Sequence, residues 1–225
     1  MADDTRDRVI DAAGPIFAEK GFEGATVREI CQAAGVNLAS VNYHFGDKQR
    51  LYFATVKAAH LMRMKQVPPA QWPEETTPEE QLRLYIHTAL RRMLGHNELS
   101  WQMRLMTREI LQPTGALVDV VEQGIRPQLS VLLGILDHFL PPDTPEHVRY
   151  QTAFSIIGQC LHYRFGKDFV AMLVPEEERN EHYSIEQLAD QITRFSLAAL
   201  TRLRDESQQS GDAHSISSAS PASTA

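Results

Sequence analysis

Residues 25–52 read ATVREICQAAGVNLASVNYHFGDKQRLY, and this stretch decides the fold. Its apolar spacing predicts one short helix from Thr26 through Ala34 and a second helix over Leu38–Phe45. Gly35 lies between the two, where a tight turn favours a residue that tolerates a positive φ. Two short helices joined by such a turn form a helix-turn-helix, whose second helix can lie in the major groove of DNA.

The segments on either side complete a small helical head. An apolar stripe predicts a helix over residues 6–19, with Thr5 as its cap and Gly21 as its stop. Asp47 is expected to cap a longer helix over Lys48–Gln66. The side chains expected to pack the two motif helices together and onto the first helix are Ile30, Ala34, Val36, Val41 and Phe45.

This head resembles the DNA-binding signature of the TetR family over about residues 6–55. The residues that carry the resemblance are Gly21-Phe22, Thr26-Val27-Arg28-Glu29-Ile30, Ala33-Ala34-Gly35-Val36, Tyr43-His44-Phe45, Lys48 and Leu51-Tyr52. The resemblance implies a repressor whose N-terminal helix-turn-helix binds DNA and whose larger all-helical domain dimerises and senses a small molecule. The residues it implies as DNA contacts are Thr26, Arg28, Asn37, Ala39, Ser40, Asn42, Tyr43, His44 and Lys48.

Three of these candidates also have a structural interpretation. Tyr43 could be partly a core residue. Thr26 could cap its helix, which does not exclude a phosphate contact. Arg28 could pair with Glu29 or Asp47 on a solvated face.

The rest of the chain divides at a proline-rich stretch. Residues 67–78 read VPPAQWPEETTP and are expected to form a linker. We therefore expect a helix-turn-helix domain over residues 1–50, which helix 48–66 connects to the body. A ligand-binding and dimerisation domain is expected over residues 79–204, and a disordered tail over residues 205–225, which are poor in bulky apolar side chains.

The apolar spacing remains helical through the body. No convincing strand, repeat or heptad array is found, so the predicted fold class is all-α with about nine helices: a three-helix head and a helical-bundle body. The helices predicted in the body cover residues 79–95, 100–111, 115–140 with a break or kink at Pro127, 145–165, and 184–204 with a capping box at Ser184.

The two long helices over residues 145–165 and 184–204 carry clear apolar stripes. Such helices from two subunits would form an intermolecular four-helix bundle, as in the proteins that the head resembles. Gly158 and Ala153 would allow close approach. The alternative is that the stripes pack only within the monomer, because periodicity does not say whose core is filled. The residues of the expected dimer interface are Tyr150, Phe154, Ile157, Leu161, Leu188, Ile192, Phe195 and Ala199.

A sensor pocket is expected among the central helices, because the family places it there. Adaptable apolar side chains and a few polar groups could line it. Each polar group also has an ordinary alternative: His162 as a hydrogen-bonded histidine, and Arg108 as the partner of Glu109 or another carboxylate. The ligand-binding candidates are Met93, Trp101, Arg104, Met106, Arg108 and His162.

Two short stretches resemble a TetR subfamily linked to antibiotic sensitivity and efflux control, the cefoperazone–chloramphenicol type. They are TREILQPTGA at 107–116 and GQCLHYRFGK at 158–167. The resemblance does not identify an inducer.

Charge distribution limits how the head could bind DNA. The 225 residues carry a net charge of −7. Residues 1–66 hold nine Lys/Arg and eight Asp/Glu, a net of +1, and residues 67–225 hold thirteen and twenty-one, a net of −8. A nearly neutral head binds DNA only if its basic groups share one face. Cys31 and Cys160 form no Cys-x-x-Cys pair, so neither a disulfide framework nor a zinc site is expected.

Other classes of protein are disfavoured. No run of 18 apolar residues and no secretory signal is present, so we expect a cytoplasmic protein without membrane contact. No His-Glu-x-x-His, Glu-x-x-His pair, phosphate-binding Gly loop or Gly-x-Ser-x-Gly elbow is found. We therefore expect no enzyme, no cofactor and no metal.

The resulting hypothesis is a repressor that binds a palindromic operator as a homodimer. A small-molecule effector would shift the population towards a form in which helix 48–66 swings and the spacing of the two heads changes. The partners expected are double-stranded DNA, the effector and a second copy of the chain. The alternatives are a helical protein-interaction adaptor that no longer binds DNA, and an activator or a regulator without ligand.

Overall fold

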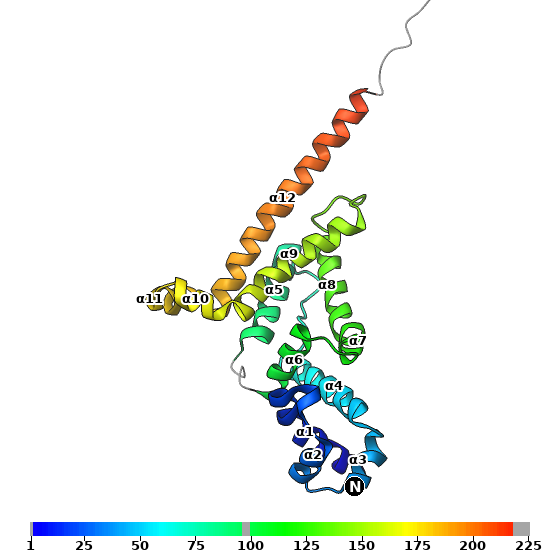
Figure 1. The fold of residues 1–225 in the computed structure, drawn as a ribbon. Coiled ribbons are helices and arrows are strands. Elements are labelled where there is room, and N and C mark those ends of the chain that lie inside the picture. The colour runs from blue at the N-terminus through cyan, green and yellow to red at the C-terminus, as the bar shows by residue number, and fades with distance from the viewer. Residues whose placement is uncertain (1, 96–99, 218–225) are drawn as a thin grey trace, which may run out of the picture. The chain divides into compact units, whose positions relative to one another are not determined.

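The computed structural model describes residues 2–95 and 100–217, and all regular structure within them is helical (Figure 1). These helices form two compact units. Unit 1 comprises Met1–Pro69 and Leu94–Gln128, and unit 2 comprises Ala70–Met93 and Leu129–Ala225. Packing thus divides the chain differently from the expected order of domains, because residues 94–128 pack with the N-terminal head. The functional boundaries expected from the sequence stay a prediction.

Unit 1 contains the three head helices and the elements that cover them. They are α1 (Ala2–Gly24), α2 (Val27–Ala34), α3 (Leu38–Phe45), α4 (Lys48–Gln66), α6 (Trp101–Leu111), α7 (Ala116–Val120) and the π-helix η1 (Val121–Ile125). Helix α6 packs against both α1 and α4. The approach to α1 is close, because a Cβ on Gly14 would lie only 2.4 Å from the Trp101 ring.

Helix α1 differs from its prediction at both ends. It begins at Ala2, so Thr5 lies inside the helix and does not cap it. Gly21 interrupts the helix where a stop was predicted, with φ 72° and ψ −178°. This φ is open to glycine and strained for a residue with a Cβ. Helical structure then resumes as far as Gly24.

The motif helices pack as predicted around one apolar core. Ile30, Val41 and Phe45 are buried against α1. Of the two other residues in the predicted set, Ala34 is buried and Val36 is partly buried against the same core. The head is therefore held together by the residues that its apolar spacing identified.

Unit 2 contains longer helices and two short ones. They are α5 (Pro78–Leu94), α8 (Arg126–Leu136), α9 (Glu146–Phe165), α10 (Lys167–Leu173), α11 (Glu176–His182) and α12 (Ile185–Ser217). Helices α9 and α12 pack against each other. Among the described helices, none combines the length and apolarity needed to cross a membrane.

The described part of the chain has more helices than the nine or so expected. The predicted helix over 115–140 is divided into α7, η1 and α8, and α8 ends at Leu136. The break falls at the π-helix before Pro127, because a proline in a helix interior disturbs the hydrogen-bond ladder of the preceding turn. Helices α10 and α11, over residues 167–182, were not predicted.

The last helix is longer than predicted. The capping box at Ser184 is confirmed: Gln187 N–H donates to Ser184 Oγ at 3.2 Å, and Gln187 Oε1 accepts from Ser184 N–H at 3.1 Å. The helix does not end at Arg204 but continues to Ser217. Residues 205–217, for which disorder was expected, thus continue α12 in the structure, and the expected disorder stays a prediction. The remainder of the predicted tail, 218–225, lies outside the described residues.

Candidate DNA-binding surface

The turn between α2 and α3 forces the second helix away from the first. Gly35 adopts the left-handed conformation, with φ 64° and ψ 38°. Its N–H donates to the carbonyl of Gln32 at 3.3 Å, and the N–H of Val36 donates to the carbonyl of Cys31 at 3.0 Å. This pair of bonds is a Schellman motif. The predicted requirement for glycine at this turn is confirmed.

Thr26 caps α2 with a complete capping box. Its Oγ1 accepts a hydrogen bond from Glu29 N–H at 3.2 Å, and a Glu29 carboxylate oxygen accepts one from Thr26 N–H at 3.2 Å. Glu29 also pairs with Lys20 of α1. The hydrogen bond from Lys20 lowers the pKa of the Glu29 carboxyl. Thr26 therefore caps α2, and its side chain is also exposed to solvent.

Helix α3 has one face anchored in the core and one face open to solvent. Val41 and Phe45 are buried, with 1% and 6% of their surface exposed. Tyr43 is 84% exposed, so it is not a core residue. Ala39 and Asn42 are exposed on the same helix. The helix thus presents a row of side chains outward while its other face fixes its orientation.

The start of α3 is organised by its own polar residues. Asn37 is the N-cap, and its Oδ1 accepts from the N–H of Ser40 at 2.8 Å and from the Ser40 hydroxyl at 3.0 Å. The amide nitrogen of Asn37 is not used by these bonds, so it stays available as a donor for an acceptor on a base edge or a phosphate. Both residues lie at the helix terminus that favours anions.

The next two candidates lie at the α3–α4 junction. His44 is half-buried and its ring meets the Tyr43 ring edge-on, with centroids 5.1 Å apart. Lys48 is half-buried at the start of α4, where its Nζ donates to the Glu23 carbonyl at 3.3 Å and lies 4.7 Å from the centre of the Phe22 ring. These contacts keep the ammonium group beside the N-terminus of α4.

Arg28 is exposed, and its two expected carboxylate partners each pair with a different cation. Glu29 pairs with Lys20, and an Asp47 oxygen lies 3.8 Å from the Nε of Arg50. The alternative that Arg28 pairs with either of these carboxylates is therefore wrong.

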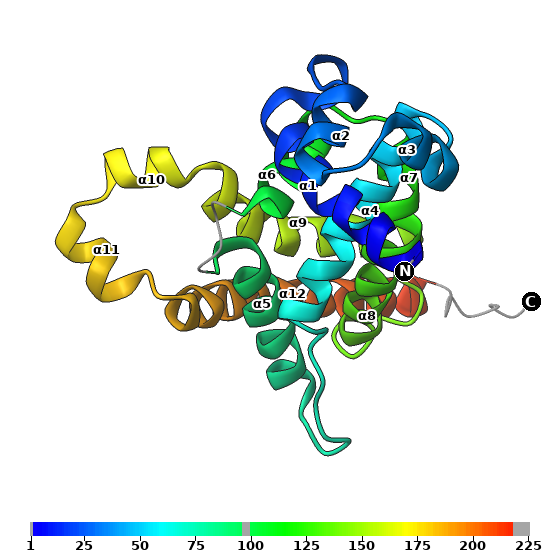
Figure 2. The same ribbon diagram turned by 90° about the horizontal axis from the view of Figure 1, so that it is seen from below.

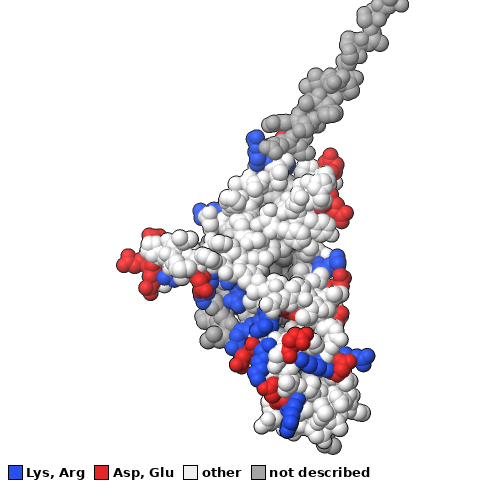
Figure 3. All heavy atoms as spheres, in the orientation of Figure 1, with Lys and Arg blue, Asp and Glu red and all other residues white. Residues whose placement is uncertain are grey.

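Sequence reasoning missed two cations near α3. The Arg6 guanidinium lies 5.5 Å from the centre of the Phe45 ring, at the end of α3. Arg50 lies in the first turn of α4, and its side chain is 76% exposed. Arg50 follows α3 closely in sequence, so its position could have identified it, whereas Arg6 is far from α3 in sequence and reaches it only through the fold. On the face of unit 1 seen in Figure 3, positive and negative side chains are interspersed, and no continuous basic patch covers it.

The ligand-binding candidates fall in different parts of the fold. Trp101, Arg104, Met106 and Arg108 are in unit 1, and Met93 and His162 are in unit 2. The Trp101 ring packs on Gly14, Met106 is buried in the unit 1 core, and Arg104 is exposed. Met93 is half-buried, and His162 is exposed with its ring 5.6 Å from that of Tyr163.

Arg108 does not pair with Glu109. Its Nη2 donates to the Glu19 carbonyl near the end of the first part of α1, at 3.0 Å. Its guanidinium also fills the space beside Gly21, where a Cβ would lie 2.8 Å from Nη1. The expected carboxylate partner is corrected, because neighbouring positions on a helix point in different directions.

Glu109 is a buried carboxylate that sequence reasoning treated only as a partner for Arg108. It is fully buried, and one oxygen accepts from the Tyr52 hydroxyl at 2.8 Å. The other accepts from the N–H and the hydroxyl of Thr114, both at 2.7 Å. Burial and the bond to Glu109 raise the pKa of Tyr52. A glutamate among the apolar residues of α6 was the available signal for this cluster.

The residues of the expected dimer interface divide between the interior of unit 2 and its surface. Leu188 and Ile192 are buried within the chain, as is Ala153. Phe154 and Phe195 are 57% and 63% exposed. Tyr150, Ile157 and Leu161 are half-buried, and Ala199 is exposed. A Cβ on Gly158 would meet no atom within 4 Å, so this part of α9 faces open space.

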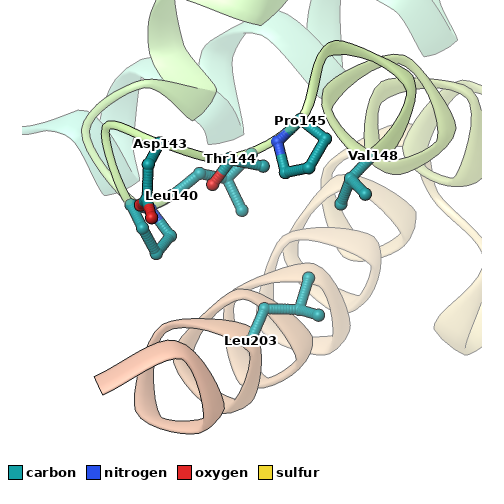
Figure 4. Close-up of a pocket in the computed structure, with 7 residues that line it drawn as sticks. Leu140, Asp143, Thr144, Pro145, Val148 and Leu203 are labelled. Carbon is teal, nitrogen blue, oxygen red and sulfur yellow. The ribbon is translucent and has the colours of Figure 1, made fainter. Parts of the chain in front are cut away.

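Unit 2 contains a small pocket of about 190 Å³ at the start of α9. Figure 4 shows Leu203 of α12 facing the loop that precedes α9 and the first turns of that helix. The labelled residues that line the pocket are Leu140, Asp143, Thr144, Pro145, Val148 and Leu203. None of the six ligand-binding candidates lines it.

A three-helix head with an outward α3 defines a helix-turn-helix DNA-binding protein, and the comparisons with known proteins specify which kind. Residues 9–55 match the family described as "Bacterial regulatory proteins, tetR family". Residues 78–200 match "HTH-type transcriptional dual regulator CecR, C-terminal domain". The chain therefore belongs to the TetR family of transcriptional regulators, in the group that carries the CecR C-terminal domain.

Individual relatives agree with this assignment. The dual regulator CecR of Shigella flexneri is 30% identical over 174 residues, which cover 73% of this chain and 78% of CecR. The repressor AcnR of Corynebacterium efficiens is 40% identical over 53 residues, which cover 24% of this chain and 28% of AcnR. A solved transcriptional regulator of Rhodococcus sp. Rha1 has the same fold, with a TM-score of 0.61 at 18% identity over 86% of this chain and 96% of the other. The chain is a DNA-binding transcriptional regulator.

Proposed function

We propose that this chain is a ligand-responsive repressor that binds a palindromic operator as a homodimer and is released by a small-molecule effector. The observation that carries the proposal is the orientation of α3, which buries Val41 and Phe45 and presents Tyr43 almost fully to solvent. A helix anchored on one face and open on the other can enter the major groove without rearrangement.

The polar groups around α3 have distinct proposed roles. Asn42 and Ser40 lie on the helix that faces the bases, and Ala39 would contact a thymine methyl. Thr26, Tyr43 and other groups at the helix termini would contact phosphates, which position the protein without reading sequence. The remaining phosphate-contact candidates are Arg28, Asn37, His44 and Lys48, with Arg6 and Arg50 added by the structure.

A homodimer is supported by the exposed apolar residues of unit 2. Phe154 of α9 and Phe195 of α12 lie in solvent in the single chain, and Gly158 leaves room for another helix. Large apolar side chains grouped on one surface mark interaction sites. A dimer would also double the contacts of a head whose net charge is close to zero.

Release by an effector would act through α4. This helix follows α3 directly and packs against α6 and α7 in unit 1. A displacement of α6 would therefore reach the DNA-binding helix through α4. The effector must bind the displaced form more tightly than the DNA-competent form, or no shift occurs.

The test is operator binding as a function of salt. Fluorescence anisotropy with the DNA upstream of the protein's own gene should show a specific site, and log affinity should fall linearly with log salt. Asn42→Ala should weaken binding to that site more than to random DNA, whereas Gln128→Ala in α8 is a matched control that should change neither. A chain that binds no duplex at low salt would instead be a protein-interaction adaptor.

Effector release is tested in the same assay with small molecules whose binding to the protein has first been measured by calorimetry. A saturating compound should lower operator affinity at least about fivefold if it couples to DNA binding. If calorimetry shows that a compound binds and the operator affinity is unchanged when that compound is saturating, the release mechanism is contradicted.

A further inference from the structure

Between α9 and α12 the chain makes an excursion that has no apolar core of its own. We call residues 167–182, which form α10 and α11, the arm. None of the residues in these two helices is buried. Both views show the arm projecting away from α9 and α12 (Figures 1 and 2). Helices of seven residues are too short to be stable in water without packing.

The arm carries a continuous apolar face. Phe169, Met172 and Leu173 are 64%, 73% and 81% exposed. They follow Phe165, which is 41% exposed at the end of α9. Within α10, the spacing of positions 169, 172 and 173 places these three side chains on one side of the helix. A group of large apolar residues at this level of exposure marks a docking surface.

The same unit has an apolar pocket that its own chain leaves open. The pocket at the start of α9 is lined by Leu140, Pro145, Val148 and Leu203, among others. Its volume of about 190 Å³ is below the range of pockets for drug-sized ligands. It is close to the roughly 150 Å³ that accommodates one benzene ring. The pocket therefore fits one or two side chains.

The arm of a chain lies far from the pocket of that same chain. The pocket lies at the N-terminal end of α9, and the arm begins after its C-terminal end. Helix α9 has 20 residues. Its length is thus about 30 Å. A second chain with its α9 antiparallel to the first would place each arm beside the pocket of the other.

The middle of α9 is suited to that crossing. Phe154 is exposed there, and Gly158 faces open space. A two-fold interface pairs the same surfaces reciprocally, so an arm-to-pocket contact occurs twice.

From this geometry we propose that the arm docks on a second copy of the chain, with Phe169, Met172 or Leu173 entering the pocket at the start of the partner's α9. This inference rests on the homodimer in the proposed function and adds the contact that holds it. The arm is ordered by that contact, and each pocket is closed by the other chain.

A disulfide between copies tests the placement in the full-length protein. Leu173→Cys in one tagged chain and Asp143→Cys in another should form a mixed disulfide under mild oxidation. Leu173→Cys with Glu79→Cys, at the start of α5 and outside the pocket lining, is the matched control. The native Cys31 and Cys160 are buried, and burial raises the pKa of Cys160 to about 12, so their background should be low. Cross-linking in the control at the same level, or none in the test pair, would overturn the proposal.

A charge on the arm tests its contribution to the dimer. Leu173→Asp should raise the dimer dissociation constant at least about tenfold, as measured by analytical ultracentrifugation. Leu111→Asp, at a residue that is 67% exposed in unit 1, should leave it unchanged. If Leu173→Asp has no effect while the wild type is a dimer that binds operator DNA, the arm serves another partner; the docking proposal fails and the proposed function stands. A wild type that is monomeric and ignores duplexes would contradict both.

Discussion

Helices α3 and α6 belong to the same compact unit and use their most distinctive side chains in opposite ways. Helix α3 leaves Tyr43 84% exposed. Helix α6 buries Glu109 completely and packs Trp101 on Gly14. The first helix presents side chains to solvent, whereas the second packs against α1 and α4. Polarity or aromatic character alone therefore does not identify a binding residue in this protein.

The largest expected effect is in α6. Glu109→Ala should lower the free energy of unfolding by about 3 kcal/mol, because it leaves the buried donors of Tyr52 and Thr114 without their acceptor. Urea denaturation measures this change. Glu109→Gln keeps one carbonyl oxygen and should lose less. If the Glu109→Ala protein has normal stability but no longer responds to effector, α6 is a binding helix. The contrast between α3 and α6 then fails.

The next largest effect is in α3. Tyr43→Ala should weaken operator binding by about 2 kcal/mol, or about 30-fold, when both heads of a dimer lose the contact. Its free energy of unfolding should change by less than about 0.5 kcal/mol, because the side chain is almost fully in solvent. Anisotropy and urea denaturation on the same sample separate the two quantities. A Tyr43→Ala protein with a lower free energy of unfolding but normal operator affinity would contradict this prediction.

A smaller effect is expected at the start of α2. Thr26→Ala removes the side-chain half of the capping box and should lower the free energy of unfolding by about 1 kcal/mol. Thr26→Ser keeps the cap and serves as the control. If Thr26→Ala lowers operator affinity far more than it lowers stability, Thr26 belongs with the exposed residues of α3 as a DNA contact.

The smallest effect is a dependence on pH. Lys20 lowers the pKa of the Glu29 carboxyl in the folded state. The stabilisation is therefore complete at pH values above the ordinary glutamate pKa and is lost as pH falls through the lowered pKa. The free energies of unfolding of the wild type and of Glu29→Gln should therefore differ at neutral pH, and the difference should shrink as pH falls through that acidic window. Because both side chains are exposed, added salt should reduce the difference.

The head could be predicted in detail because its local rules agree with one another. The glycine turn at Gly35, the buried positions Val41 and Phe45, and the cap at Asp47 all follow from short-range constraints. The outward row on α3 then follows by geometry, because a helix with two anchored positions has only one free face.

The rest could not be predicted, because the deciding contacts join residues far apart in sequence. The partners of Arg108 and Glu109 are Glu19, Tyr52 and Thr114, and no periodicity in α6 indicates them. Leu188 and Phe195 lie on one predicted stripe, yet one is 5% exposed and the other 63%. An apolar stripe in the sequence does not show which of its residues are buried within the same chain and which stay exposed.

The carboxylate of Glu109 has a consequence for how unit 1 can move. It is held by hydroxyl and amide dipoles from α4 and from the segment before α7. Parting α6 from α4 by a single ångström would leave a charge in an apolar interior with too few donors, which is costly. We therefore expect α4 and α6 to keep these contacts and to move together rather than apart.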